Sequence, residues 1–344
     1  MRIVLTGGGT AGHTNPNVAV IEGFKEKYPE VELLYIGSEN GPEKVLVEKT
    51  GVLFRAVECG KLRRYLSFEN VKDFFRVPVG ILQARKILKE FKPDKVFSKG
   101  GFVSVPVCIA AWSLKIPVIL HESDFSPGLA NRISAKFADT ICVSFEESKK
   151  FFKRRKVKVC GNPVRKMIFG GKKEKGYDLT GFTTEKPVLL IMGGSLGAKQ
   201  INDLTFNHLP ELLKHCQVVH ITGKGKGCID HVREKLKDYK QFEYLHKELA
   251  DIYAITDLVV SRAGANTLAE ISALGLPSVL IPLSLKASRG DQIENAKIFE
   301  EKEMAIHLKD TKQFTDIIIA ALKHLDSFKK VKNEAVEKII SLLI

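Results

Sequence analysis

A glycine-rich stretch near the N-terminus, LTGGGTAGHTNP (residues 5–16), combines a phosphate-binding pattern with an ionisable side chain. It directly follows a short apolar run, and Gly7, Gly9 and Gly12 fit G-x-G-x-x-G. Glycines between a strand and a helix allow a tight turn and direct backbone N–H groups at a phosphate. His13 follows the last glycine, where a plain dinucleotide loop has no use for an imidazole. The stretch therefore predicts either a cofactor loop or a phosphate loop with chemistry built into it.

The acidic residue that a dinucleotide loop needs comes late in this chain. In a Rossmann dehydrogenase this residue ends the second strand, about 20 residues downstream, and holds the ribose. Here the second apolar run ends YIGSEN, and the nearest candidate is Glu39. The kinase or ATPase pattern G-x-x-x-x-G-K-[ST] is also absent from the sequence. A phosphate loop is therefore favoured over a nicotinamide site, and glycines that only permit a tight turn are the remaining alternative.

A second polar segment, HESDFSPGLANR (residues 121–132), carries His121, Glu122 and Asp124 at the end of another apolar run. A carboxylate at the end of a strand is placed to act as a general base or to bind sugar hydroxyls. A solvated loop has the same residue types, so both interpretations stay open.

A third polar segment, SRAGANTLAEI (residues 261–271), places Thr267 and Glu270 three positions apart at the start of a predicted helix. There they share a face near the positive end of the helix dipole, and Glu270 is placed to accept two hydrogen bonds from a ribose diol. The same spacing is that of a helix capping box, which is the structural alternative. Downstream, SRGDQIENA offers Asp291 and Gln292 at the next strand-to-helix junction.

The elements that must position these groups are apolar runs of strand length alternating with helix-period segments, which indicates parallel sheets with right-handed crossovers. Both halves of the chain open alike, because MGGSLGA follows the first run of the second half as GGGTAGH follows that of the first. A glycine pair, Gly100 and Gly101, sits at a further strand-to-helix junction. The predicted strands are RIVLT, VELLYIG, DKVFSKGG, PVILHES, DTICVS and VKVCGNP, then PVLLIMGG, QVVHITG, FEYL, DLVVSRAG and PSVLIPL.

Two such series predict an α/β protein of two Rossmann-like domains, residues 1–163 and 164–325, with parallel sheets that face each other across a cleft. The polar stretch FGGKKEKGYDLTGFTTEK (residues 169–186) is predicted to be a loop before the second sheet. The last segment, about residues 326–344, is predicted to be a helix that packs back on the first domain.

The charge balance favours an anionic partner. Fifty-four Lys and Arg against forty Asp and Glu leave a net charge of +14, which suits a membrane surface, nucleic acid or a phosphorylated substrate. In residues 61–89 apolar side chains are interleaved with cations, as in a helix on anionic lipid, although a core helix has the same periodicity. The predicted membrane patch consists of Arg63, Arg64, Leu66, Phe68, Lys72, Phe74, Phe75 and Arg76.

Cysteine spacing and segment lengths exclude several other classes. The six cysteines form no C-x-x-C pair, and no D-x-D or H-E-x-x-H motif occurs, so free thiols and no metal are predicted. We expect Cys108, Cys142, Cys160 and Cys216 to be buried, because they lie in apolar runs. The N-terminus lacks a signal peptide, and no apolar stretch reaches about 20 residues. A cytoplasmic protein with peripheral membrane contact is therefore expected.

Together these segments resemble the MurG family of glycosyltransferases. GGGTAGH, SKGGFVSVPVCIAAWSLKIPVILHESD, PGLANR, GNPVR, MGGSLGA and SRAGANTLAEI…GLPSVLIP…DQIENA occur in that family's order and spacing, over nearly the whole chain. The GKLRRYLSFENVKD and SRGDQ stretches resemble its Gram-positive branch. The resemblance implies a GT-B fold with a second domain that binds the UDP-sugar donor and a first domain that faces the acceptor and the membrane.

The same resemblance implies a reaction. N-acetylglucosamine would pass, with inversion, from UDP to the muramyl 4-hydroxyl of an undecaprenyl-diphosphate-linked muramyl-peptide (lipid I to lipid II), a step of peptidoglycan synthesis. It implies no cofactor, no nucleic-acid partner, and a location on the cytoplasmic face of the cell membrane. His13 is the first candidate for the base that the attacking hydroxyl needs, and Glu122 is the second.

Motif matching to the family assigns the remaining site residues. Glu270 would bind the ribose, Arg165 and Ser195 the diphosphate region, and Gln292 the sugar, while the backbone near Leu245 and His246 would read the uracil. The implied donor-binding set is Thr10, Ala11, Gly12, Asp124, Arg165, Ser195, His246, Ala265, Asn266, Thr267, Glu270 and Gln292. The implied ligands of the acceptor diphosphate are Gly9, Gly100 and Gly101.

Two positions depart from the family pattern. Ala11 replaces the middle glycine of the usual T-G-G-H, which adds one methyl group beside the ligand. Asp124 stands where many members have an Asn, so this side chain accepts from a hydroxyl but cannot donate to one. Alternatives to the implied function are another GT-B glycolipid glycosyltransferase, such as one acting on diacylglycerol, an NAD-dependent oxidoreductase, and a non-catalytic membrane scaffold.

Overall fold

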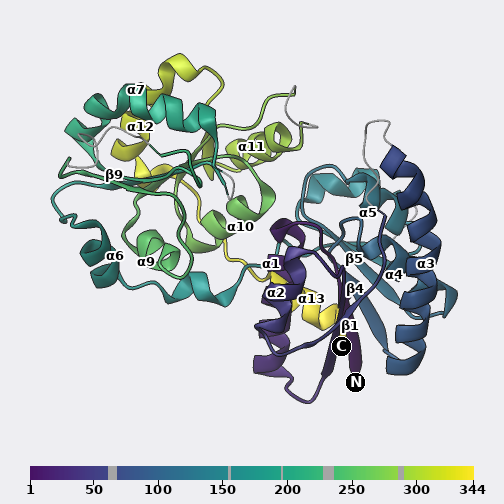
Figure 1. Cartoon of the computed structure of the whole chain (residues 1–344). Coiled ribbons are helices and arrows are strands. Elements are labelled where there is room, and N and C mark those ends of the chain that lie inside the picture. Colours follow the sequence, from purple (N-terminus) through teal and green to yellow (C-terminus); the bar gives the residue numbers. More distant parts are fainter. Residues whose placement is uncertain (61–67, 154–155, 195–196, 228–235, 286–289) are drawn as a thin grey trace. The chain divides into compact units, whose positions relative to one another are not determined.

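The chain folds into two α/β units, each built on one parallel sheet (Figure 1). Unit 1 comprises residues 1–165 together with residues 334–344, and unit 2 comprises residues 166–333. The computed structural model describes residues 1–60, 68–153, 156–194, 197–227, 236–285 and 290–344, except for the side chains of residues 11 and 68–75.

Unit 1 contains a sheet of seven strands in the order β3-β2-β1-β4-β5-β6-β7, all of them parallel. The inner strands are fully buried apolar runs, which is typical of a parallel sheet covered on both faces. The strands are β1 (Arg2–Thr6), β2 (Glu32–Gly37), β3 (Leu53–Ala56), β4 (Lys95–Ser98), β5 (Val118–Glu122), β6 (Thr140–Val143) and β7 (Lys156–Val159).

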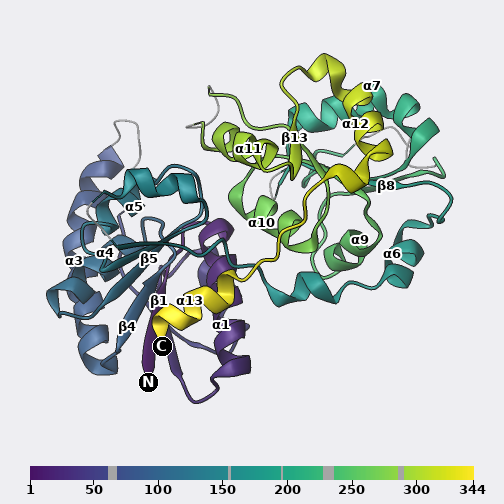
Figure 2. The same ribbon diagram turned by 180° about the vertical axis from the view of Figure 1, so that it is seen from behind.

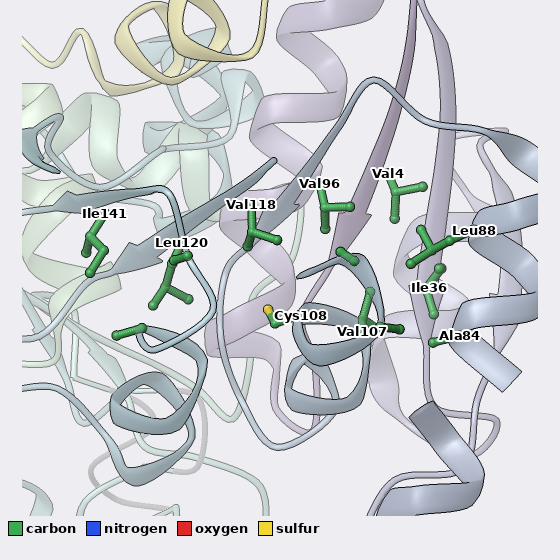
Figure 3. Packing of buried hydrophobic residues seen from close by; sticks show 14 of the residues in the cluster. Val4, Ile36, Ala84, Leu88, Val96, Val107, Cys108, Val118, Leu120 and Ile141 are labelled. Carbon is green, nitrogen blue, oxygen red and sulfur yellow. The ribbon is translucent and has the colours of Figure 1, made fainter. Parts of the chain in front are cut away.

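Helices cover both faces of this sheet. One face packs against α3 (Phe68–Phe91), α4 (Ser104–Ser113) and α5 (Leu129–Ser134). Figure 3 shows this core, in which side chains of the strands such as Val4, Val96 and Leu120 meet Leu88 of α3 and Cys108 of α4. The other face is covered by α1 (Ala11–Lys27), α2 (Pro42–Glu48) and α13 (Ala335–Leu343), and a short 3-10 helix, η1 (Glu146–Phe151), precedes β7.

The C-terminal helix α13 lies beside α1 in unit 1, although the chain reaches it from unit 2 (Figure 2). Its apolar side is buried in the same cluster as Phe24 of α1 and consists of Ile339, Ile340 and Leu343. The helix begins at Ala335, later than the predicted start near residue 326, and the intervening η4 (Leu325–Ser327) lies within unit 2.

Unit 2 repeats the plan with six parallel strands in the order β10-β9-β8-β11-β12-β13. Its strands are β8 (Val188–Met192), β9 (Gln217–Ile221), β10 (Tyr239–Phe242), β11 (Leu258–Ser261), β12 (Ser278–Leu280) and β13 (Ala305–His307). The helices described in unit 2 are η2 (Lys166–Gly170), α6 (Lys173–Thr180), α7 (Lys199–His215), α9 (Leu249–Ile255), α10 (Ala265–Leu274), α11 (Asp291–Glu301), η3 (Thr311–Gln313), α12 (Phe314–Lys323) and η4.

Both sheets contain the order 3-2-1-4-5-6 when their strands are numbered from the first of each unit. In such sheets the order in which strands are added reverses between strands 1 and 4, and ligands bind beyond the carboxyl ends of the strands at that switch point. In unit 1 the switch point lies between β1 and β4, and in unit 2 it lies between β8 and β11. These four strands therefore define where a site is expected in each unit.

Several local predictions were wrong. The predicted strand FEYL shares only Phe242 with the observed β10, because this edge strand carries the polar Lys240 and Gln241 and lacks an apolar run. The predicted loop at residues 169–186 contains the helix α6, whose Gly176 packs so tightly on α9 that a Cβ would lie 2.4 Å from the Asp251 carbonyl oxygen. The short edge strands β3 and β13 were not predicted.

Candidate active site

The two glycine loops of unit 1 meet at its switch point. The loop after β1 runs through Gly7, Gly8 and Gly9 into α1, and the loop after β4 runs through Gly100 and Gly101 into α4. Gly101 has φ +84°, and a Cβ there would lie 2.3 Å from the carbonyl oxygen of Gly8 and 3.1 Å from Cδ2 of His13. Only glycine permits this close approach. The structure therefore brings together three groups that the sequence analysis singled out separately.

His13 lies in the first turn of α1, which begins at Ala11 after Thr10. Its backbone N–H donates to the carbonyl oxygen of Thr10 (3.2 Å), and its half-buried ring lies against Gly101. The imidazole therefore lies beyond the carboxyl ends of the strands, where a phosphorylated ligand is expected. Thr10 is exposed and Gly12 half-buried, and the side chain of Ala11 lies outside the described residues.

The loop after β5 is organised around Glu122. This carboxylate is only 4% exposed and accepts three N–H groups: from the backbone of Asp124 (3.0 Å) and Gly128 (3.2 Å), and from Nδ2 of Asn131 (2.8 Å). Three donors on one buried carboxylate favour its ionised form. The pKa of Glu122 is nevertheless raised to about 7, mainly because the carboxyl group is buried and secondly because Asp124 carries a like charge. Glu122 thus resembles a loop anchor more than a base open to substrate.

His121 has a structural role in unit 1. It is fully buried, and its Nε2–H donates to the carbonyl oxygen of Gly161 (2.7 Å), beyond the end of β7. The pKa of His121 lies well below its ordinary value, mainly because the ring is buried and secondly because Lys99 is positively charged. The imidazole is therefore neutral, with its proton on Nε2, and it ties the end of β5 to the chain after β7.

Three residues of this site were missed by the sequence analysis. Lys99 is fully buried directly after β4, and its Nζ donates to Ser123 Oγ (2.9 Å). Glu43 of α2, also fully buried, accepts from the backbone N–H groups of Gly9 (3.1 Å) and Ser38 (3.0 Å). Asn131 of α5 crowds Gly100, where a Cβ would lie 2.2 Å from Asn131 Oδ1. A charged residue at the end of an apolar run was the available signal for Lys99.

The switch point of unit 2 has a loop between β8 and α7, of which Gly193, Gly194 and Gly197 are described and Ser195 is not. Gly197 has φ +67°, and a Cβ there would lie 2.0 Å from the carbonyl oxygen of Thr222 at the end of β9. The buried Asn202 of α7 supports the same region, because its Nδ2 donates to that carbonyl oxygen (2.9 Å). Gly197 therefore packs directly on the backbone at the end of β9.

Arg262 holds the neighbouring loop after β11 and was also missed by the sequence analysis. It is 7% exposed, and its Nη1 donates to the carbonyl oxygens of Ile281 (2.8 Å) and Pro282 (3.1 Å) and to Oε1 of Gln200 (3.0 Å). The guanidinium thus links the chain after β11 to α7 and to the chain after β12. Burial lowers its pKa, although an arginine remains charged in proteins.

The helix α10 begins at Ala265, with Gly264 as its N-cap residue. Thr267 therefore lies inside the helix, which rules out the capping-box interpretation of Thr267 and Glu270. Ala265, Asn266, Thr267 and Glu270 are all half-buried. Oε2 of Glu270 accepts from the hydroxyl group of Tyr253 in α9 (3.4 Å). A carboxylate one turn inside a helix that starts at the switch point is well placed for a ribose diol.

The remaining donor-binding candidates are spread over both units. Gln292 lies in the first turn of α11, and its Oε1 accepts from the backbone N–H of Leu283 (3.1 Å). His246 is exposed, its ring packs edge-on against Tyr244, and its backbone N–H donates to Glu248 Oε2 (3.2 Å). Arg165 is half-buried at the end of the first segment of unit 1.

Most of the predicted membrane patch lies outside the described residues. Arg63, Arg64 and Leu66 are not described, nor are the side chains of Phe68, Lys72, Phe74 and Phe75. Arg76 of α3 is exposed, and its Nε lies 3.9 Å from Glu58 Oε2. Further along α3, Val79 and Leu82 are exposed beside the cations Arg85, Lys86 and Lys89.

The burial of the described thiols agrees with the sequence. Cys108, Cys142, Cys160 and Cys216 are free and buried, as predicted. In the described parts of the chain, no three His, Cys, Asp or Glu side chains are grouped as a metal site. None of the helices described is both long and apolar enough to cross a bilayer.

The fold and its switch-point loops define the class of the protein. Two Rossmann-like α/β units in tandem are the GT-B fold, as the sequence analysis predicted. The chain aligns with the crystal structure of Acinetobacter baumannii MurG with a TM-score of 0.73 at 22% identity, over 99% of each chain. At 22% identity this structural similarity supports the fold alone.

Sequence comparison identifies the family. Residues 3–143 match the glycosyltransferase family 28 N-terminal domain, and residues 188–341 match the glycosyltransferase family 28 C-terminal domain. The chain is 47% identical to the UDP-N-acetylglucosamine–N-acetylmuramyl-(pentapeptide) pyrophosphoryl-undecaprenol N-acetylglucosamine transferase of Lachnoclostridium phytofermentans, over 99% of this chain and 98% of that one. It is also 47% identical to the transferase of the same name from Legionella pneumophila, over 99% and 93%. The chain therefore belongs to the MurG family of glycosyltransferases.

Proposed function

We propose that the protein transfers N-acetylglucosamine from UDP-N-acetylglucosamine to the muramyl 4-hydroxyl of undecaprenyl-diphosphate-linked N-acetylmuramyl-peptide, converting lipid I to lipid II. The observation that carries the proposal is the full-length match, 47% identical over 99% of the chain, to transferases named for this reaction. The product is the lipid-linked precursor of peptidoglycan, so the reaction belongs to cell-wall synthesis and thereby supports cell shape and division.

Unit 2 binds the UDP-sugar in this proposal. Glu270 accepts the ribose hydroxyls, the start of α10 from Ala265 to Thr267 lines the nucleotide, and Gln292 contacts the sugar. The ten-residue length of α10 and its start at the switch point support this assignment, because helix N-termini there attract the diphosphate. Ser195 binds the diphosphate region together with Arg165, the last residue of the first segment of unit 1, and the backbone near His246 reads the uracil.

Unit 1 binds the acceptor and supplies the base. The backbone N–H groups of Gly9, Gly100 and Gly101 bind the acceptor diphosphate, while Thr10, Ala11 and Gly12 approach the transferred sugar. His13 is the base, since it lies against Gly101 at the glycine loops. Glu122 is a less suitable base, because its two carboxylate oxygens already accept three N–H groups.

The reaction is a single displacement at the anomeric carbon. The acceptor oxygen forms a bond to C1 of N-acetylglucosamine while the bond from C1 to the UDP oxygen breaks, which inverts the configuration. The proton of the hydroxyl group passes to the imidazole of His13, and UDP leaves with the bonding electrons. Positive charge develops on the sugar ring, by analogy with glycoside hydrolysis, and negative charge on UDP. Backbone N–H groups and Arg165 stabilise that negative charge without a metal or cofactor.

We further propose that unit 1 rests on the anionic cytoplasmic face of the cell membrane. The exposed Val79 and Leu82 of α3 and the exposed Trp112 at the end of α4 are apolar side chains in a basic setting of Arg85, Lys86 and Lys89. Apolar residues flanked by cations favour an interface with acidic lipid. The acceptor is held in that membrane by its lipid tail, and nucleic acid has no part in the proposal.

The decisive experiment supplies purified, folded protein with radiolabelled UDP-N-acetylglucosamine and alternative acceptors. Transfer to the undecaprenyl-diphosphate-linked acceptor is expected, together with UDP binding and no NADH binding in calorimetry. Transfer to diacylglycerol instead would identify a different GT-B glycolipid transferase. Tight NADH binding would support an oxidoreductase. Absence of turnover, with His13→Ala and Glu270→Ala both leaving biological function intact, would support a scaffold.

A further inference from the structure

A lysine without a role in the proposed mechanism lies beneath the glycine loops of unit 1. Lys99 is 0% exposed, although lysine is rarely buried completely unless it is paired. Its Nζ donates to Ser123 Oγ (2.9 Å), and its stem packs under the first loop, where a Cβ on Gly7 would lie 3.1 Å from Lys99 Cβ. One neutral hydroxyl group is a weak partner for a buried ammonium group, so its charge calls for carboxylates nearby.

Two carboxylates supply the opposite charge. Glu122, at the end of β5, is 4% exposed, and Asp124 follows two residues later. Burial lowers the pKa of Lys99 to about 8, and Glu122 and Asp124 oppose that shift. Burial and Asp124 raise the pKa of Glu122 to about 7, and Lys99 opposes that shift. From β5, His121 also faces this group, but it is neutral, and α5 contributes the uncharged amide of Asn131.

The hydrogen bonds to Glu122 favour its ionised form, although burial opposes it. Its two oxygens accept the N–H groups of Asp124, Gly128 and Asn131, and Asn131 in turn crowds Gly100. A protonated carboxyl group would direct its own hydroxyl hydrogen into this set of donors and lose acceptor strength. Any group that keeps Glu122 ionised therefore also keeps the loop of residues 122–128 and the second glycine loop in place.

We propose that Lys99 is the buried counter-ion of Glu122 and Asp124 and a positioning residue of the acceptor side. Its positive charge offsets the repulsion between the two carboxylates and holds Glu122 in its hydrogen-bonded, ionised form. The proposal also explains how this chain accommodates Asp124 where many family members have an uncharged Asn. The expected effect on catalysis rests on the proposed transferase function, whereas the pairing of Lys99 with the two carboxylates does not.

The test follows the backbone amide of Gly128 by two-dimensional NMR during a pH titration of the whole protein. This N–H donates directly to Glu122 Oε2, so its chemical shift reports the ionisation of Glu122 independently of catalysis. The midpoint is expected near pH 7 in the wild type. In Lys99→Met, which keeps the length of the side chain and removes its charge, it should rise by about one pH unit. In Asp124→Asn it should fall, because the like charge is gone.

A matched control and a double variant complete the experiment. The amide of Gly225 in unit 2 donates to Glu243 Oε1 (2.9 Å), and its titration should be the same in all variants. Lys99→Met/Asp124→Asn should bring the Gly128 midpoint back toward the wild type. Unchanged Gly128 midpoints in Lys99→Met and Asp124→Asn would overturn the proposal. If Lys99→Met does not fold, Asp124→Asn decides alone, since an unmoved midpoint there overturns it too.

The catalytic arm separates this inference from the proposed function. Lys99→Met should lower transferase kcat/KM most at acid pH, and Asp124→Asn in the same chain should restore part of it. Wild-type protein that transfers no sugar to the lipid-linked acceptor would refute the proposed function, while the NMR midpoints would still decide whether Lys99 is the counter-ion.

Discussion

The two units share a strand order but differ in how their switch points are built. In unit 1, the buried ionisable residues Lys99, Glu122 and Glu43 hold the loops, and each carboxyl group accepts more than one N–H group. In unit 2, the loops are held by backbone carbonyl oxygens, through Arg262 and the neutral Asn202. We therefore expect the loop around Glu122 in unit 1 to respond to protonation near pH 7, whereas Arg262 and Asn202 keep their charge state at that pH.

A buried histidine in unit 2 illustrates the contrast. His220 of β9 lies between Tyr239 and Asn202, with Nδ1 3.0 Å from the tyrosine hydroxyl oxygen and Nε2 3.1 Å from Asn202 Oδ1. Burial lowers its pKa to about 3, so it stays neutral throughout the physiological range. The contact with His220 orients Asn202, whose Nδ2 donates to the carbonyl oxygen of Thr222, and this arrangement requires no change in the charge of His220.

The largest effect should come from the base of unit 1. His13→Ala should lower kcat by about 10²- to 10⁴-fold, because the attacking hydroxyl loses its general base. The dissociation constant for UDP, measured by calorimetry, should stay unchanged, since His13 is not among the proposed ligands of UDP. A UDP affinity that falls in parallel with kcat would break the division of roles between the units.

Next in size is the loss of the ribose ligand in unit 2. Glu270→Ala should weaken UDP binding by about 10- to 100-fold, as expected for hydrogen bonds to a charged group. Glu270→Gln is the matched control: it keeps one acceptor oxygen and the contact with Tyr253, and should lose less. With 2′-deoxy-UDP, which lacks one of the two ribose hydroxyl groups, the loss of affinity caused by Glu270→Ala should be smaller than with UDP; an equal loss would contradict the ribose assignment.

Arg262 tests the carbonyl-based support of unit 2. Arg262→Met should lower the free energy of unfolding by about 1–3 kcal/mol, because the carbonyl oxygens of Ile281 and Pro282 lose their buried donor. Urea denaturation followed by circular dichroism measures the loss. Arg132→Met in unit 1 is the control, since that side chain is exposed and donates only to Pro127 O, and it should change stability little. Equal losses in both variants would contradict the buried role of Arg262.

The raised pKa of Glu122 should make the stability contribution of this residue depend on pH. The folded-state pKa of Glu122, about 7, lies above its unfolded value of 4.5, so the folded protein binds more protons between these values. This group's contribution to stability is therefore greatest at low pH and declines as pH rises toward 7. The stability of the wild type relative to Glu122→Gln should fall over this window in urea titrations. A difference that rises with pH would contradict the raised pKa.

The smallest effect concerns the membrane. Lys86→Ala on α3 should weaken co-sedimentation with vesicles containing acidic phospholipid by about fivefold, since one surface cation contributes roughly 1 kcal/mol. Lys323→Ala on α12 of unit 2 is the matched exposed control and should have no effect. Equal losses for both lysines would mean that net charge, and not a face of unit 1, attracts the protein to lipid.

Local sequence features were sufficient to predict the fold class and the strand ends at which chemistry is expected. Apolar runs, glycine loops and the order of the motifs are such features, so Gly101, His13 and Glu270 could be predicted as site residues from the sequence. The same approach failed where apolar periodicity is weak, as at the polar edge strand β10 and the short helix α6. These elements depend on neighbours distant in the chain, such as Val218 for β10 and Asp251 for α6.

The contacts of each polar group depend on the tertiary structure. The sequence predicts Glu122 as a candidate base and Thr267 and Glu270 as a possible capping box, and it predicts no role for Lys99. The fold gives Glu122 three N–H donors, starts α10 at Ala265, and buries Lys99 beneath both glycine loops. The physical reason is that burial and charge pairing arise from residues brought together across a sheet, and these set protonation and hydrogen bonding in a way that residue order does not encode locally.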